Sequence, residues 1–211
     1  RHGLNTGRST RKWGAILNEV LKHSHREDGS LKGGPDVING KDFGARGDGV
    51  SDDTEAIQKA IDAGNEVYFP SGIYRLTKRI ELKANMTLRG ANRIATTLRN
   101  ESNDTCLYAT SGLKGSRHIT IQDIFIEDGF PSRTAGHGIH IDGEESGAVV
   151  SIDRVIINGH VDGIRLHAVF ISSLKEIRVN DPEQDAFSFY GLCTSTSLIS
   201  TYANASRRHG Y

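Results

Sequence analysis

The feature that most constrains this chain is a repeat of short alternating apolar runs in its second half. Three octets align without gaps at offsets of 31 and 22 residues, and they begin at Ile121, Ile152 and Leu174. Three shorter runs follow them at offsets of 25 and 23 residues, beginning at Gly138, Gly163 and Ala186. A period in the twenties with two short strands per unit is typical of a parallel β-solenoid, in which each turn stacks its apolar side chains on those of the next.

Composition narrows the function classes. The 211 residues are 36% apolar and 25% charged, and 26 Lys+Arg balance 26 Asp+Glu, which argues against a basic nucleic-acid binder or an acidic tail protein. We expect no membrane insertion and no signal peptide, because no run of about 18 apolar residues occurs and the first residues are polar. Cys106 and Cys193 lack the spacing of a metal or redox motif.

The first 36 residues differ from the rest in the spacing of their apolar residues. Apolar residues recur there at spacings of three and four and predict an amphipathic helix over residues 9–22; they are Trp13, Ile16, Leu17, Val20 and Leu21. A helix this short is marginal alone, so its apolar face needs a partner, either further copies of the chain or the domain downstream. We therefore divide the chain into a helical attachment or neck segment with its linker, 1–36, and a solenoid, 37–211.

The solenoid segment opens with polar, glycine-rich turns followed by a helix. Residues 55–63 are predicted to be helical, with Asp52 and Glu55 forming a capping box and Gly64 ending the helix. Residues 66–69 and 73–76 are predicted strands joined by a turn. The chain starts at Arg1 and its single methionine is Met86, so we expect a fragment whose further turns lie beyond residue 211.

The opening of the solenoid resembles a known family. The sequence DFGARGDGVSDDT at residues 42–54, the apolar helix positions after it and VYFPSGIY at residues 67–74 are similar to the start of the pectate-lyase-superfamily right-handed β-helix found in phage tail fibres, tail spikes and polysaccharide-degrading enzymes. The resemblance covers residues 37 to about 90 closely. It implies a mainly β fold, a right-handed parallel β-helix with an N-terminal capping helix, often trimeric in phage proteins and directed at cell-surface glycans.

Within that family, the helix and linker ahead of the module resemble the attachment segment and neck of virion appendages. We therefore predict a homotrimeric structural component of a phage tail fibre or tail spike, a minor tail protein located in the virion tail. Its expected partners are its own copies, other phage tail proteins and a host cell-surface glycan used in adsorption. The alternatives are a polysaccharide depolymerase, either a lyase or a glycoside hydrolase, and a cell-surface adhesin that uses the solenoid as a stalk.

Two outward columns on the second strand of each unit are candidates for carbohydrate binding. The first column contains His140, Arg165 and Ser188, and the second contains Asp142, His167 and Tyr190. Arginine and histidine can bond sugar hydroxyls or carboxylates, and a tyrosine ring offers a face to a sugar ring. Any solenoid also fills such columns with polar residues as ordinary solvated surface. No catalytic residue is assigned.

Two further sets of residues have both a functional and an ordinary interpretation. Asp162 and Asp185 fall one turn apart behind His137, near the carboxylate spacing of a retaining glycosidase, yet aspartate is common at such corners. His23 and His25 resemble the His-x-His pairs of fibrous phage trimers, where six imidazoles surround one metal ion, although a charged linker also carries solvated histidines. No other cofactor is expected.

Overall fold

A computed structural model of the chain describes residues 37–110, 118–143 and 147–207. These residues form a parallel β-solenoid of three sheets, which confirms the predicted mainly β solenoid. The helix expected at residues 9–22 and the His23/His25 pair lie outside the described residues, so both stay predictions. The right-handed sense of winding also stays a prediction.

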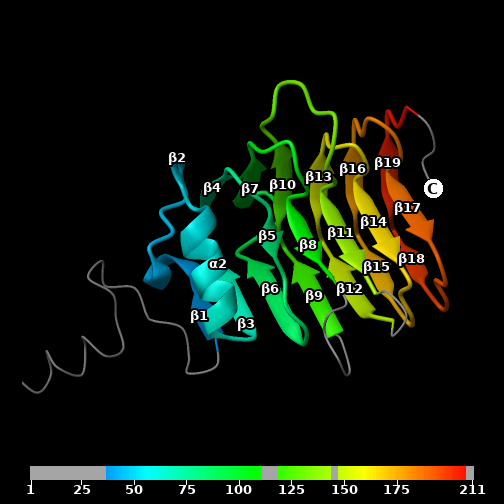
Figure 1. Ribbon diagram of the computed structural model, residues 1–211, viewed down its shortest axis with the longest axis horizontal. Coiled ribbons are helices and arrows are strands. Elements are labelled where there is room, and N and C mark those ends of the chain that lie inside the picture. The colour runs from blue at the N-terminus through cyan, green and yellow to red at the C-terminus, as the bar shows by residue number, and fades with distance from the viewer. Residues whose placement is uncertain (1–36, 111–117, 144–146, 208–211) are drawn as a thin grey trace, which may run out of the picture. The chain divides into compact units, whose positions relative to one another are not determined.

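Each inner turn contributes one strand to each sheet, the first and last described turns contribute strands to the first and second sheets, and the strands stack from one end of the solenoid to the other (Figure 1). The first sheet contains β1 (Val37–Asn39), β3 (Glu66–Phe69), β6 (Met86–Gly90), β9 (His118–Gln122), β12 (Val149–Asp153), β15 (Ser173–Lys175) and β18 (Ser197–Ile199). The second sheet contains β2 (Asp48–Asp52), β4 (Gly72–Leu76), β7 (Thr96–Asn100), β10 (Phe125–Asp128), β13 (Ile156–Asn158), β16 (Arg178–Asn180) and β19 (Tyr202–Asn204). The third sheet contains β5 (Ile80–Glu81), β8 (Leu107–Ala109), β11 (Ile139–Asp142), β14 (Ile164–His167) and β17 (Phe187–Tyr190).

The expectation of two strands per unit is wrong, because each aligned octet is two strands rather than one. A residue with left-handed backbone separates them: Asp123 (φ 59°), Arg154 (φ 52°) and Glu176 (φ 52°). One such residue is enough to turn the chain from the first sheet to the second while the apolar positions on both sides stay inward. The octet therefore looks continuous in the sequence.

The same three residues occupy the third position of each aligned octet and form a ladder on the surface. The Arg154 guanidinium donates from Nε and Nη2 to the two carboxylate oxygens of Asp123, at 2.7 and 2.9 Å. These hydrogen bonds raise the pKa of Arg154, with Asp153 and Glu176 adding nearby negative charge. The aligned offsets in the sequence are thus true neighbours along the solenoid axis.

One α-helix, α2 (Thr54–Ala63), lies in the described ranges, beside the first strands at the blue end of Figure 1. It follows β2 at the point where a third-sheet strand comes in later turns, and it packs against β5. Its buried face carries Ile57, Ala60 and Ile61, which join the main core. The helix ends at Ala63 as predicted, while its role as a cap stays a prediction.

The predicted capping box at the start of α2 is wrong. The N-cap is Asp53, not Asp52, and the Asp53 side chain makes no capping hydrogen bond. Asp52 accepts from the backbone N–H of Thr54 at 3.0 Å, one residue before the cap position. The Asp53 carboxylate instead accepts from the backbone N–H groups of Arg46 and Gly47, at 2.7 and 3.0 Å. The loop that follows the short 3-10 helix η1 (Gly40–Phe43) uses that carboxylate as the acceptor for these two backbone donors, so the carboxylate is not available to the helix.

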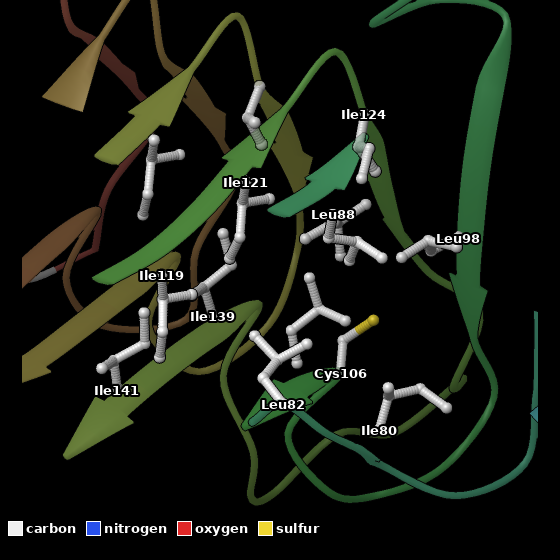
Figure 2. Packing of buried hydrophobic residues seen from close by; sticks show 14 of the residues in the cluster. Ile80, Leu82, Leu88, Leu98, Cys106, Ile119, Ile121, Ile124, Ile139 and Ile141 are labelled. Atoms are coloured by element: carbon white, nitrogen blue, oxygen red, sulfur yellow. The ribbon is translucent and has the colours of Figure 1, made fainter. Parts of the chain in front are cut away.

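The core is a column of aliphatic side chains enclosed by the three sheets. Figure 2 shows Ile119 and Ile121 of the first sheet, Leu98 of the second and Ile139 of the third directed toward one another. Burial of each such side chain contributes about 1.5–3 kcal/mol, so every turn adds a similar increment of stability. None of the helices in the described ranges has the length and apolar character of a membrane-spanning helix.

Candidate functional site

The outer face of the third sheet brings the predicted glycan-binding residues together. His140 pairs in register with Arg165, and Asp142 pairs with His167. The next strand continues both columns, with Ser188 after Arg165 and Tyr190 after His167. All of these side chains are half-buried, so they form one continuous polar surface across β11, β14 and β17.

Tyr190 is the residue on which this surface converges. The imidazole of His167 stacks on its ring with centroids 4.3 Å apart and an interplanar angle of 6°. The Arg165 guanidinium carbon lies 4.6 Å from the ring centroid, and the Tyr190 hydroxyl is hydrogen-bonded to Nε2 of His140 at 2.9 Å. His167 covers one face of the Tyr190 ring, so a sugar that stacks on Tyr190, as the sequence predicts, has to use the other face.

Two further rings extend this surface toward the N-terminal turns. Tyr108 on β8 and His137 each contact the ring of His140 edge-on, with centroid distances of 5.2 and 5.3 Å. Sequence analysis missed Tyr108, although it precedes His140 by one turn in the same column. The ring stripe is defined here as Tyr108, His137, His140, His167 and Tyr190.

Arginines lie along the ring stripe. The guanidinium carbon of Arg79 is 4.7 Å from the ring centroid of Tyr108, as Arg165 is close to Tyr190. Cation–π contacts of this kind contribute about 0.5–1 kcal/mol at exposed sites. The surface therefore offers aromatic faces together with planar hydrogen-bond donors.

A buried carboxylate anchors the stripe from below. The side chain of Asp162 is 1% exposed, and its Oδ2 lies 3.5 Å from Nη1 of Arg165 and 3.4 Å from Nδ1 of His137. Its Oδ1 accepts from the backbone N–H of Asp185 in the next turn, at 3.1 Å. Because Asp162 and Asp185 are both buried, with exposed fractions of 1% and 6%, they orient their neighbours and are not placed to meet a substrate as a glycosidase pair.

The histidines of the stripe that lie deepest are neutral at pH 7. Burial, helped by the positive charge of Arg165, lowers the pKa of His137 to about 4. Burial also lowers the pKa of His140 to about 4, with His137 and Arg165 adding to the effect. The contact between His137 and Asp162 is consequently not an ion pair at neutral pH, and Nδ1 of His137 accepts from the Asp162 backbone N–H at 3.3 Å.

The loop that carries His137 into the stripe is fixed by a buried arginine. Arg133 is 2% exposed and donates from Nε and Nη2 to the two oxygens of Asp128, at 2.7 and 2.6 Å. The same guanidinium donates to the backbone carbonyls of Asn100, Asp104 and Ala135. This loop, residues 129–136, is the insertion that lengthens its turn to 31 residues.

The donor groups present suit a sugar better than a metal. Among the described residues, no cluster of three or more histidine, cysteine or acidic side chains could hold a metal ion. The ring stripe offers stacking surfaces and hydrogen-bond donors, which are the groups that recognise sugar rings and hydroxyls. The Tyr190 hydroxyl and Nε2 of His140 also lie within hydrogen-bond distance of each other, which is the geometry that proton transfer requires.

Comparison with known proteins agrees with the fold. Residues 37–128 match a family model described as rhamnogalacturonase A/epimerase, pectate lyase-like. The A-module of mannuronan C-5 epimerase AlgE4 from Azotobacter vinelandii superimposes with a TM-score of 0.67 and 27% identity, over 83% of this chain and 52% of that one. The chain contains a pectate-lyase-like β-helix module.

Curated relatives of the module fall into two groups. The preneck appendage protein of Bacillus phage PZA is 43% identical over 56 residues, which is 26% of this chain and 7% of that protein. Mannuronan C5-epimerase AlgE1 of Azotobacter vinelandii is 58% identical over 48 residues, 20% of this chain and 3% of that protein. The module thus spans a small part of the length of these relatives.

The family match and the ring stripe occupy different parts of the module. The matched residues 37–128 include the opening loop, α2 and the first turns. Four of the five ring-stripe residues lie at 137–190, beyond the match. The opening turns are therefore the part of the chain that resembles the family, and most residues of the ring stripe lie outside that part.

Proposed function

We propose that this module is a structural part of a phage virion appendage, a tail fibre or tail spike. In that assembly it forms a homotrimer and contacts a host cell-surface glycan during adsorption. The observation that carries the proposal is the ring stripe, a built recognition surface on a module whose relatives include phage preneck appendage proteins. Its location in the virion follows from the same relationship, and the other tail proteins to which it attaches would contact residues 1–36.

The dimensions of the stripe suit a short stretch of oligosaccharide. Tyr108 and Tyr190 are separated by three steps of the third sheet, from β8 to β17. At about 4.8 Å per step this corresponds to about 14 Å, the length of a few sugar units. His140 and Arg165 lie between the two tyrosines and would donate hydrogen bonds to the hydroxyl groups of the sugar. Asp142 would accept hydrogen bonds from sugar hydroxyl groups.

The test compares two tyrosines on different faces of the module. Tyr190→Ala removes the ring on which the stripe converges, and Tyr68→Ala removes an outward tyrosine of the first sheet. Immobilised bacterial lipopolysaccharides, capsular polysaccharides and teichoic acids would be probed with each variant of the full chain. We expect Tyr190→Ala to lower the affinity about tenfold and Tyr68→Ala to leave it unchanged. Equal loss in both variants, or no binding by the unaltered chain, would refute glycan recognition by the stripe.

Assembly and virion location are tested separately. Light scattering of the full chain should give the mass of three chains, and an antibody against the module should label the appendages of intact particles in electron micrographs. If Trp13, Ile16, Leu17, Val20 and Leu21 form the trimeric neck, replacing Leu17 by Asp abolishes the trimer. If His23 and His25 bind a metal, elemental analysis finds about one ion per three chains.

A second candidate function, a polysaccharide lyase or glycoside hydrolase, is favoured by one specific contact. Tyr190 and His140 form a hydrogen-bonded pair beside the Arg165 guanidinium, an arrangement able to move a proton next to a bound anionic sugar. Several curated relatives act on mannuronan or alginate by name. Incubation with a panel of acidic polysaccharides distinguishes the two functions. If the chain produces no unsaturated sugars and no new reducing ends, a lyase or glycoside hydrolase at this site is excluded.

A further inference from the structure

The two arginines that lie along the ring stripe are already compensated by carboxylates of the same chain. Nη1 of Arg165 lies 3.5 Å from Oδ2 of Asp162, whose side chain is 1% exposed. Arg79 donates from Nε to Oε1 of Glu81 at 2.5 Å, and its Nη1 lies 3.8 Å from Oδ2 of Asp104. Neither guanidinium therefore offers an uncompensated positive charge to a ligand.

The balance of charge on this surface is acidic. The Asp142 side chain is 23% exposed, and its Oδ1 lies 2.6 Å from Nδ1 of His167. His137 and His140 are neutral at pH 7, because burial lowers the pKa of each to about 4. In the described ranges, the ion pairs of this surface involve four carboxylates and two guanidinium groups, and an acidic excess persists when His167 is counted as a cation.

Such a surface penalises an acidic sugar. A uronate carries a negative charge at pH 7, and on a half-buried surface this charge loses water without gaining an uncompensated cation. Arg133 does not change the balance, because its side chain is 2% exposed and is paired with Asp128. An uncharged sugar meets no such penalty, since its hydroxyl groups can donate to carboxylates such as Asp142 and accept from the N–H groups of Arg165.

We propose that the ring stripe binds an uncharged glycan, a chain of hexoses or N-acetylhexosamines, and discriminates against chains that contain uronic acids. The inference rests on the glycan recognition proposed above and names the class of sugar that the stripe takes. The same acidic excess disfavours the anionic sugar of the second candidate function. Specificity of this kind comes from charges that the chain keeps beside the site, as much as from the groups that touch the sugar.

A similar arrangement on the first sheet provides a matched control. The guanidinium carbon of Arg89 lies 5.1 Å from the ring centroid of Tyr68, and its Nη2 lies 3.7 Å from Oε1 of Glu66. On the ring stripe, Glu81 and its arginine beside Tyr108 form the equivalent set. The side chains of Glu66 and Glu81 are 41% and 45% exposed, so replacing either by glutamine removes one negative charge of similar accessibility.

The experiment presents the full chain with capsular polysaccharides that contain uronic acids, immobilised in native form and after carboxyl reduction. Reduction converts each uronate to the neutral hexose and keeps the linkages. The dissociation constants of the two forms give a preference ratio, which is measured for the unaltered chain, Glu81→Gln, Glu66→Gln and Tyr190→Ala. Circular dichroism of each variant confirms that the comparison is made on folded protein.

We expect the unaltered chain to bind the reduced form about tenfold more tightly than the native form. Glu81→Gln should lower this ratio about two- to fivefold, because the charge of Arg79 is then compensated only by Asp104, and Glu66→Gln should leave the ratio unchanged. Equal or tighter binding of the native form, or an equal change of the ratio in both glutamine variants, overturns the inference; if Tyr190→Ala still weakens binding, glycan recognition by the stripe stands. No binding of either form, or binding that Tyr190→Ala leaves unchanged, overturns both the inference and the proposed function.

Discussion

Replacing Arg133 by methionine tests the buried clamp that positions the edge of the ring stripe. The substitution keeps the side-chain length and removes the charge and every hydrogen bond of the guanidinium. Arg133 and its partner Asp128 are 2% and 15% exposed, so the carboxylate cannot turn to water when its partner is lost. Breaking one side of such a buried pair costs about 3–5 kcal/mol in free energy of unfolding.

The size of the effect follows from which contacts remain. Asp128 keeps the backbone N–H groups of Phe130, at 2.9 Å, and His160, at 3.3 Å, while the carbonyls of Asn100, Asp104 and Ala135 lose their shared donor. The matched control is Arg207→Met, because Arg207 pairs with Glu183 at the surface, with side chains 70% and 41% exposed. An exposed pair of that kind contributes about 0–1 kcal/mol.

Urea unfolding of the full chain, followed by circular dichroism, measures both variants. The double variant Asp128→Asn/Arg133→Met removes the unpaired charge as well, and we expect it to recover about 1–3 kcal/mol relative to Arg133→Met alone. A loss below about 1 kcal/mol in Arg133→Met, or a loss no larger than that of Arg207→Met, would refute the argument that this pair is a buried clamp.

The same variants have a defined pH dependence. Burial opposes ionisation of Asp128, but the hydrogen bonds from Arg133 and Phe130 hold its pKa below the ordinary 3.8. In the unaltered chain this stabilisation is present above pH 3.8 and is lost as the pH falls through the lower folded pKa. Without Arg133, burial dominates and raises the pKa, so the cost of the substitution should shrink as the pH is lowered from 7 toward 4. An equal cost at both pH values would contradict the assignment.

Three further predictions use the same unfolding measurement. Ile157→Ala should cost about 2–5 kcal/mol because it opens a cavity in the core, whereas Ile156→Ala, one residue away and outward, should cost under about 1 kcal/mol. Arg154→Gln should cost at most about 1 kcal/mol, because its side chain is 37% exposed and water screens the ladder. His137 and His140 have pKa values of about 4 in the folded chain against an ordinary 6.5, so the unfolded chain binds protons first as the pH is lowered. The free energy of unfolding should therefore fall as the pH is lowered from 6.5 to 4, and His140→Gln should make that fall smaller.

Register along the axis could be predicted from the sequence because each turn repeats the same backbone geometry. In a solenoid, an alignment of repeats is also an alignment in space, so the offset between His140 and Arg165 predicted their pairing, and Asp123 and Arg154, which share one position of the aligned octets, are in contact. The inward positions follow for the same reason, since a slip of one residue would expose every isoleucine. These features depend only on local periodicity.

The bend within each octet could not be predicted in this way. A left-handed residue such as Asp123 or Glu176 leaves the apolar pattern intact on both sides, so the division of each octet into two strands was invisible. The capping box failed for a related reason. The helix begins so that Asp53, not the predicted Asp52, is its N-cap, and the Asp53 carboxylate is bound by backbone groups of the preceding loop, a competition that exists only when the loop is folded.

The sequence by itself determined the solenoid, its register and which polar residues lie in register on successive strands, because these follow from a repeated pattern of side chains. Only the tertiary structure decided how those columns work together. The approach of Tyr108 and His137 to His140, the burial of Asp162 and the clamp of Arg133 join residues about a turn apart through a loop that obeys no period. Such contacts form where the insertion at 129–136 folds back on the preceding turn, and their geometry depends on packing and desolvation in three dimensions.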